Sequence, residues 1–161
     1  MRIWSLLMLL LVSPSLSCQP PETSTLHEQI TSMVLEIWNT GNLDLIEEVY
    51  APEYVRHYVD IYDDIVGIAG MREWVTYTRS VAPDFTLSID EQINTDDRIV
   101  TRWTVSGTHA VPGTVIKKEA TMHGTSISKI AQGKVVEDWV YFNEMSTYRQ
   151  LGYTIQPPIG E

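Results

Sequence analysis

Residues 134–142 alternate side chains in a pattern that could build one wall of a small-molecule pocket. Alternate residues of an extended strand point to opposite faces. One face carries Val135, Glu137, Trp139 and Tyr141 with Asn143 at its end, and the other carries Val136, Asp138, Val140 and Phe142. Aromatic rings bury a ligand and a few polar groups orient it, so we predict that the Glu137 face lines the pocket. The alternative is that Trp139 and Tyr141 are ordinary core aromatics.

Glu137 is the carboxylate that this prediction places in the pocket, two residues before Trp139 on the same face. A carboxyl group held against an indole in an apolar site is a candidate to move protons. The alternative is structural, with Glu137 pairing with a basic neighbour such as Lys134 or Arg102.

Two histidines lie in the neighbouring strands. His109 shares a strand parity with Trp103, which we predict to be a second aromatic wall, and His123 is expected to face His109 from the next strand. Two histidines without a third ligand at a diagnostic spacing do not make a metal site, so none is predicted. The sequence also lacks a glycine-rich phosphate loop and a Gly-x-Ser-x-Gly elbow, and we expect no cofactor.

The elements that must position these residues begin with helices. A capping-box pattern at Thr25 and Glu28 precedes apolar residues at helical spacing, which predicts a helix that ends near Gly41. Asn42 could cap a second helix that stops at Pro52. Residues 53–66 read as irregular, and Gly67–Val81 predicts a third helix.

The pattern then changes to a period of two, which predicts strands over 85–89, 99–105, 114–131 and 134–142. Gln132-Gly133 is a tight-hairpin signal, and a short helix before Gly152 closes the pattern. Helices followed by a twisted meander indicate an α+β fold, with three N-terminal helices covering a curved antiparallel sheet. The whole forms one domain over residues 25–155, followed by a tail at 156–161.

Three separated blocks carry a family resemblance: Arg102-Trp-Thr-Val-Ser-Gly-Thr-His109, Gly133-Lys-Val-Val-Glu-Asp-Trp139 and Gln150-Leu-Gly152. They resemble the SnoaL-like polyketide cyclase, or ester cyclase, family of the nuclear-transport-factor-2-like fold. The resemblance implies a cone-shaped sheet whose mouth admits a ligand, and this fold often dimerises through its open sheet face.

The same resemblance implies catalytic carboxylates at two positions that are neutral in this chain. An Asp is expected four residues after Trp139, where Asn143 stands, and another in a Gly-x-Asp-Ile pattern, where Ser126 stands. An amide or a hydroxyl cannot perform the usual proton transfer next to a carbonyl. Asn143 could instead cap the last helix, and Glu144 has the wrong strand parity for the role.

His57 follows Tyr54-Val-Arg56, where the resemblance places the histidine of a Tyr-Val-x-His segment near the pocket mouth. With His109 and Glu137, it completes the predicted catalytic set. The alternative for His57 is a hydrogen-bonded residue that steadies its loop.

The N-terminal residues 1–17 combine a positive start with a short apolar run, which predicts a secretion signal. The small residues before Cys18 resemble a bacterial lipoprotein cleavage site, so Cys18 is the predicted lipidated residue, and residues 18–24 form a polar tether. Ordinary cleavage near Ser17 is the competing interpretation. A disulfide is disfavoured because Cys18 is the chain's single cysteine.

The chain carries a net charge of −10. Removal of residues 1–17 would remove one positive charge, Arg2, and leave a net charge of about −11. Such a surface repels nucleic acid and anionic headgroups, so membrane attachment is expected through a lipid anchor alone.

The sequence therefore predicts an exported protein, anchored on the periplasmic or outer side of a membrane, that binds a small apolar carbonyl-containing or cyclic molecule. Its chemistry would be isomerisation or cyclisation by acid/base catalysis without a cofactor. The alternatives are a non-catalytic ligand-binding protein of the cell envelope and a homodimeric interaction protein.

Overall fold

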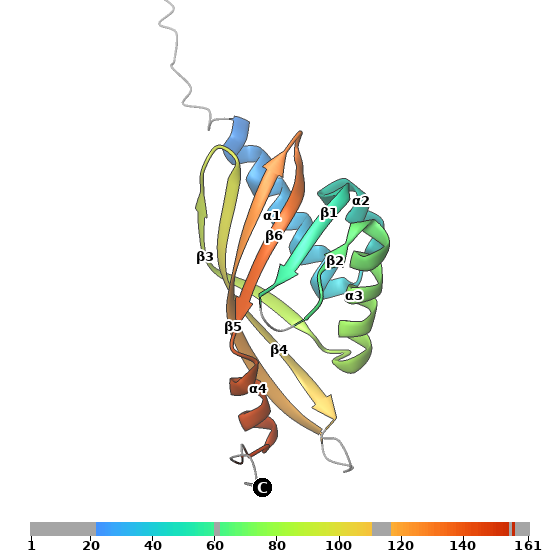
Figure 1. Cartoon of the computed structure of the whole chain (residues 1–161), viewed down its shortest axis with the longest axis vertical. Coiled ribbons are helices and arrows are strands. Elements are labelled where there is room, and N and C mark those ends of the chain that lie inside the picture. Colours follow the sequence, from blue (N-terminus) through green and yellow to red (C-terminus); the bar gives the residue numbers. More distant parts are fainter. Residues whose placement is uncertain (1–21, 60–61, 111–116, 155, 157–161) are drawn as a thin grey trace, which may run out of the picture.

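The computed structural model describes residues 22–59, 62–110, 117–154 and 156. Residues 1–17 and Cys18 lie outside the described residues, as do the first residues of the predicted tether and most of the predicted tail. Along the chain (Figure 1) the elements are α1 (Glu22–Thr40), the 3-10 turn η1 (Leu43–Leu45), α2 (Ile46–Val49), β1 (Tyr50–Tyr58), β2 (Ile65–Val66), α3 (Gly67–Val81), β3 (Thr86–Asn94), β4 (Arg98–Ala110), β5 (Lys117–Ala131), β6 (Lys134–Phe142) and α4 (Glu144–Leu151).

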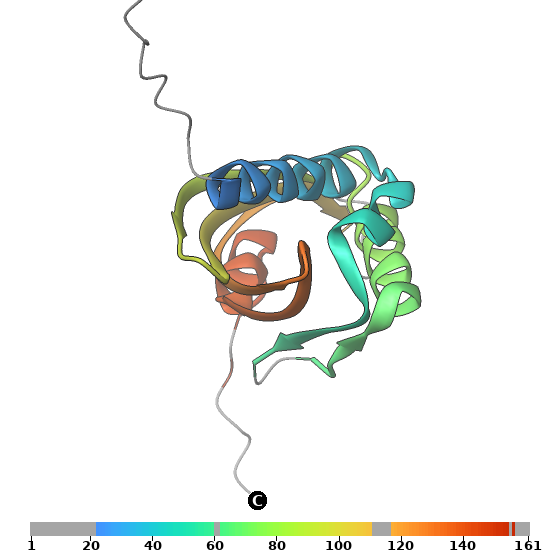
Figure 2. The same cartoon turned by 90° about the horizontal axis from the view of Figure 1, so that it is seen from above.

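The six strands form one sheet in the order β2-β1-β6-β5-β4-β3. Seen from above, the sheet curls around an interior, and α1 and α3 lie along two sides of the molecule (Figure 2). α1 packs on β3, α3 on β1, and α4 on β5. The predicted α+β class and the curved sheet are confirmed. No described helix is long and apolar enough to cross a membrane.

In the predicted back half of the chain the last hairpin and the last helix match the structure, whereas β3 runs on to Asn94 and β4 to Ala110, beyond the predicted ends at 89 and 105. The β5–β6 hairpin turns at Gln132 and Gly133, whose φ angles of 52° and 79° suit a type I′ turn. α4 ends at Gly152, which takes the left-handed conformation with φ 98°. Local turn chemistry was therefore sufficient to place these boundaries.

Three corrections apply to the predicted front half, and one applies to the helical cover of the sheet. α1 begins at Glu22, so Thr25 lies inside the helix and does not cap it. The second helix is only η1 and the four-residue α2. Residues expected to be irregular form β1 and β2, and the helical cover is completed by α4 from the C-terminal end rather than by three N-terminal helices alone.

β1 also makes the sheet mixed rather than purely antiparallel, because it runs parallel to β6. Its inward positions are Tyr54, Arg56 and Tyr58, all buried. An arginine on the buried face disguised the alternation of apolar and polar residues that marks a strand. The strand was therefore missed in the sequence.

A buried ion pair joins β1 to β6 at this parallel step. Arg56 is opposite Asp138 in the register, and its Nη2 donates to Asp138 Oδ2 at 2.9 Å. The Tyr54 hydroxyl donates to the same oxygen at 2.7 Å, and Arg56 Nε donates to that hydroxyl at 2.8 Å. The guanidinium also lies 5.4 Å from the centre of a Trp38 ring. Because Arg56 and Asp138 are only 7% and 3% exposed, each depends on the other for its charge balance.

Replacing Asp138 by Ala should lower the free energy of unfolding by about 3–5 kcal/mol, because Arg56 would keep a buried charge without its counter-charge. Urea denaturation followed by tryptophan fluorescence measures this loss. Glu47→Ala, which removes the exposed partner of Arg72, is the control and should cost at most about 1 kcal/mol. Similar losses in the two variants would contradict the importance of the buried pair.

Candidate functional site

A cavity of about 500 Å³ opens inside the cone, between the inner face of the sheet and helices α1, α3 and α4. Its wall is mainly apolar and aromatic, and it includes Trp38, Trp74, Phe85, Trp103, Met122 and Phe142. The volume falls within the range of small-ligand sites, which commonly span about 300–1,000 Å³. The cavity can therefore enclose a molecule of one or a few rings.

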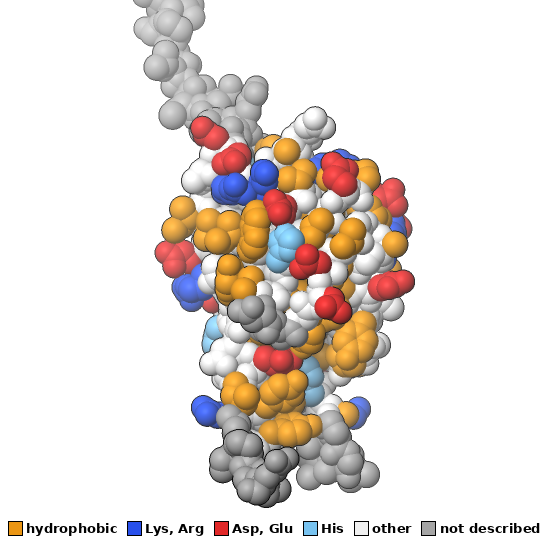
Figure 3. Space-filling model, in the orientation of Figure 1, with side chains coloured by type: hydrophobic (Ala, Val, Ile, Leu, Met, Phe, Trp, Pro, Cys, Tyr) orange, Lys and Arg blue, Asp and Glu red, His pale blue; other side chains and the backbone are white. Residues whose placement is uncertain are grey.

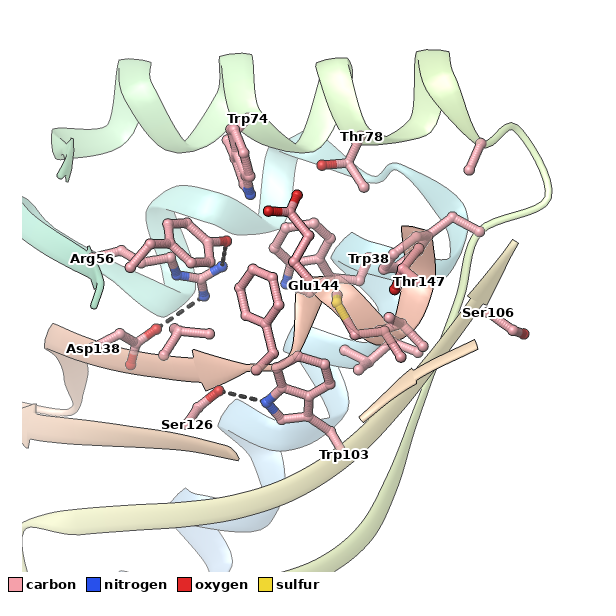
Figure 4. Close-up of a pocket in the computed structure, with 18 of the residues that line it drawn as sticks. Trp38, Arg56, Trp74, Thr78, Trp103, Ser106, Ser126, Asp138, Glu144 and Thr147 are labelled. Carbon is pink, nitrogen blue, oxygen red and sulfur yellow. Dashed lines mark hydrogen bonds and ion pairs between the residues drawn. The ribbon is translucent and has the colours of Figure 1, made fainter. Parts of the chain in front are cut away.

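Trp103 lies in this wall, as the sequence predicted, and its position depends on a glycine. Its indole Nε1 donates to Ser126 Oγ at 2.8 Å (Figure 4). A Cβ at Gly124 would lie 2.4 Å from two atoms of the Trp103 ring, so only glycine leaves room for the indole on the adjacent strand. Ser126, where the resemblance in the sequence led us to expect a carboxylate, thus accepts a hydrogen bond from Trp103.

The prediction for β6 chose the wrong face. Val135, Asp138, Val140 and Phe142 line the cavity, whereas Glu137, Trp139 and Tyr141 do not. From Glu137 onward, alternate residues of β6 point to opposite faces as predicted. The β5–β6 pairing shifts register between Lys129 and Ile130, so Val135 lies on the inner face together with Asp138. Asp138 can face inward because Arg56 balances its charge.

His57 and Glu137 do meet, but on the outer face of the sheet. His57 Nε2 lies 3.2 Å from Glu137 Oε1, and its Nδ1 lies 2.9 Å from Asp64 Oδ1. The imidazole stacks on Trp139, with ring centres 5.6 Å apart. We call His57, Asp64, Glu137 and Trp139 the outer histidine cluster. Of the predicted site residues, it holds three, and none of them lines the cavity.

His109 lines the cavity, but His123 does not line it, and the two histidines do not face each other across the strands. Across the β4–β5 ladder, His109 is opposite Lys118, while His123 is opposite Thr104 and its Nδ1 lies 2.8 Å from the Thr104 hydroxyl. Within the described residues, no group of three or more His, Cys, Asp or Glu side chains could hold a metal ion.

Asn143 caps α4, which was the structural alternative considered for it. Its side-chain oxygen accepts from the Ser146 backbone N–H at 3.3 Å, and it is not part of the cavity wall. The next residue, Glu144, points into the cavity below Trp74 (Figure 4). Its Oε1 accepts hydrogen bonds from the hydroxyls of Tyr62 and Tyr148.

Sequence reasoning excluded Glu144 by strand parity, but the parity rule no longer applies there because β6 ends at Phe142 and α4 begins at Glu144. The sequence patterns also gave no sign that Arg56 lies on a buried strand, and they placed Asp138 on the face of residues 134–142 that was not predicted to line the pocket. A sequence signal for Glu144 did exist, since Tyr148 lies one helical turn after it on the same side of α4.

Aromatic and hydrophobic side chains also surround the α4 end of the cavity. Tyr62, Tyr77, Tyr148 and Tyr153 line it, and all are 39–58% exposed. Hydrophobic side chains gather at this end of the molecule in the space-filling view, while acidic side chains are scattered above them (Figure 3). The rim is thus suited to apolar molecules.

Comparison with known proteins gives the family. The model of the SnoaL-like polyketide cyclase family matches residues 28–151, which is most of the chain. This chain belongs to the SnoaL-like polyketide cyclase family. The comparison with curated proteins found no match.

Solved structures share the fold of this SnoaL-like protein. TsrD from Streptomyces laurentii is 24% identical with a TM-score of 0.69, over 80% of this chain and 96% of its own. IdmH from Streptomyces antibioticus is 22% identical with a TM-score of 0.69, over 83% and 100%. A phenazine biosynthesis-related protein from Pseudomonas aeruginosa is 15% identical with a TM-score of 0.67, over 87% and 95%. These identities support the architecture alone.

The outer histidine cluster should make the stability of this SnoaL-like protein depend on pH. Partial burial lowers the pKa of His57, but the hydrogen bonds to Asp64 and Glu137 outweigh it, so that the pKa is raised above its ordinary value of 6.5. A raised pKa means that the folded state holds the proton more tightly than the unfolded chain does. The resulting stabilisation is complete below the unfolded value and is lost as the pH rises through the folded one.

We therefore expect His57→Gln to destabilise the protein more at about pH 5.5 than at about pH 8.5. Urea midpoints of the wild type and the variant at both pH values measure the difference. A loss of equal size at both values would mean that the protonated imidazole is not what stabilises this cluster.

Proposed function

We propose that this SnoaL-like protein binds a small, largely apolar, carbonyl-containing or cyclic molecule inside the cone and promotes isomerisation or cyclisation without a cofactor. The observation that carries the proposal is the cavity of about 500 Å³, which combines an aromatic wall with a few inward-facing polar groups. Apolar surface supplies burial and the polar groups fix orientation, which is the composition of a small-ligand site.

Acid/base chemistry at a carbonyl requires groups that reach the ligand. His109 lies in the cavity wall, whereas His57 and Glu137 lie in the outer histidine cluster. Of the three predicted catalytic residues, His109 is the one that lines the cavity. The cavity wall also holds Arg56 and Glu144, which the sequence did not single out. The neutral Ser126 and Asn143 favour the second candidate, a non-catalytic binding protein that uses the same cavity.

The ligand can be sought by native mass spectrometry of the mature protein purified from its source cells. Trp103→Leu removes an indole from the cavity wall, and we expect it to weaken retention of a co-purifying small molecule by about tenfold or more, since 1.4 kcal/mol of lost contact corresponds to a factor of ten. The matched variant Trp139→Leu removes an indole from outside the cavity and should retain the ligand.

Loss of the ligand in Trp139→Leu alone would mean that the ligand binds the face of β6 predicted from the sequence.

The same spectra report the number of chains in the assembly. We propose a homodimer that pairs through the outer face of the sheet, where Tyr141 is 47% exposed, and a monomeric spectrum would contradict it.

We also propose that the protein is exported and held to a membrane by a lipid on Cys18, a residue outside the described part of the chain. The described chain begins with α1, whose first turn lies at the end of the molecule away from α4 (Figure 1), so the proposed attachment is not made at the α4 end of the cavity. Metabolic labelling with a fatty acid and membrane fractionation test the anchor. Cys18→Ala should lose both the label and the membrane fraction, and unchanged association would contradict the proposal.

A further inference from the structure

We propose that Glu144 is the catalytic base of this site and removes a proton from the carbon next to the ligand's carbonyl group. The inference rests on the proposed function and assigns a residue to it. It gives the chain a carboxylate in the cavity although both of the expected positions, Ser126 and Asn143, are neutral.

Only two carboxylates among the described residues line the cavity, and they differ in what a ligand can reach. Asp138 uses Oδ2 to accept from Tyr54 and Arg56. Its Oδ1 has no hydrogen-bond partner among the described residues, but that atom is buried, so a molecule in the cavity cannot touch it. Asp138 is therefore a structural anchor for Arg56, which leaves Glu144 as the carboxylate that a ligand can meet.

Glu144 is held in place through one oxygen and leaves the other free. Both hydroxyl groups, from Tyr62 and from Tyr148, donate to Oε1, and no described residue donates a hydrogen bond to Oε2. Burial, and then the hydrogen bond to Glu144, raise the pKa of Tyr62 above its ordinary value, so its hydroxyl keeps the proton that it donates. One donor comes from the connection between β1 and β2 and the other from α4 itself, and together they fix the carboxylate, which is the preorganisation that a positioned base needs.

The neighbours of Glu144 match the proposed kind of ligand. Its carboxylate points toward the indole of Trp74 within the cavity (Figure 4). Trp74 also packs against the rings of Tyr62 and Tyr58, with ring centres 5.5 Å and 5.3 Å apart. A flat apolar ring system could lie against this aromatic group with a carbon atom beside Oε2.

Proton removal also places negative charge on the carbonyl oxygen of the ligand, and this charge needs a hydrogen-bond donor. Tyr58 is placed to be that donor. Its hydroxyl accepts from Arg56 Nη1 at 3.3 Å, and no described residue takes the proton that this hydroxyl can donate. Tyr58 lines the cavity and packs edge-on against Tyr62, the residue that holds Glu144. The hydroxyl, with the guanidinium behind it, is thus placed to donate to a carbonyl oxygen that becomes negative.

The proposed step balances without another reactant. The proton on the carbon beside the carbonyl moves to Glu144 Oε2, the C–H electron pair forms a C=C bond, and the carbonyl π pair moves to oxygen to give an enolate held by Tyr58. Return of the proton from Glu144 to a carbon completes an isomerisation. Alternatively, the enolate carbon attacks a second carbonyl in the same molecule and closes a ring: the new C–C bond forms, the π pair of that carbonyl moves to its oxygen, and the alkoxide takes back the proton from Glu144.

The step can be tested with 1-tetralone, a bicyclic ketone of suitable size, by following deuterium uptake next to its carbonyl in D₂O by mass spectrometry. The wild type should accelerate exchange above the buffer rate, and Glu144→Gln should lose that acceleration by about 10²-fold or more, as expected for removal of a general base. Tetralone affinity, measured by tryptophan fluorescence, should change by less than about twofold, because Gln preserves the shape of the side chain.

Glu73→Gln provides the matched control, since Glu73 lies on α3 but is exposed and not part of the cavity wall. This variant should catalyse deuterium uptake by tetralone at the wild-type rate. Tyr58→Phe should slow exchange about tenfold or more with little change in affinity, because it removes only the donor to the enolate oxygen.

Exchange by Glu144→Gln at the wild-type rate would overturn the assignment. Absence of any wild-type exchange above the buffer rate would also overturn it, whether or not tetralone binds. Binding without exchange would separate the two ideas, because it leaves the ligand pocket of the proposed function intact while removing Glu144 as its base.

Discussion

A buried ion pair between Arg56 and Asp138 holds the first long strand of this protein against the last one. It joins β1 to β6 at their parallel pairing, and the two residues are 82 positions apart in the sequence. A buried charge without its partner is strongly unfavourable, so neither strand can leave this register without exposing or isolating a charge. The pair thus closes the side of the cone that the antiparallel meander of β3 to β6 leaves open.

Closure on that side creates the conditions for a site. With β1 in place, α3 packs over the sheet and brings Trp74 to the cavity, while α4 brings Glu144 to it from the opposite end of the chain. The same ion pair lies behind Tyr58, because Arg56 donates to its hydroxyl. One structural interaction therefore also polarises a group that faces the cavity, which links the stability of the fold to the chemistry proposed for it.

The family assignment explains the fold of this protein, whereas the roles of Ser126 and Asn143 follow from the geometry of the site. Membership in the SnoaL-like family explains the cone formed by the curved sheet, a fold shared with solved structures such as TsrD. It does not explain what Ser126 and Asn143 do at the two positions where carboxylates were expected from the sequence. Their hydrogen bonds give an answer in structural terms, since Ser126 accepts from Trp103 and Asn143 caps α4, so both residues support neighbours that face the cavity.

Local signals in the sequence were enough for the period-two strands, the Gln132-Gly133 hairpin and the last helix before Gly152. It could not determine which face of β6 points inward, because the charge of Asp138 is balanced only by a residue on a strand 82 positions away. Nor could it assign Glu144, since strand parity ends where the α4 helix starts. Long-range charge pairing and the change of backbone period, which only tertiary structure specifies, decided the site.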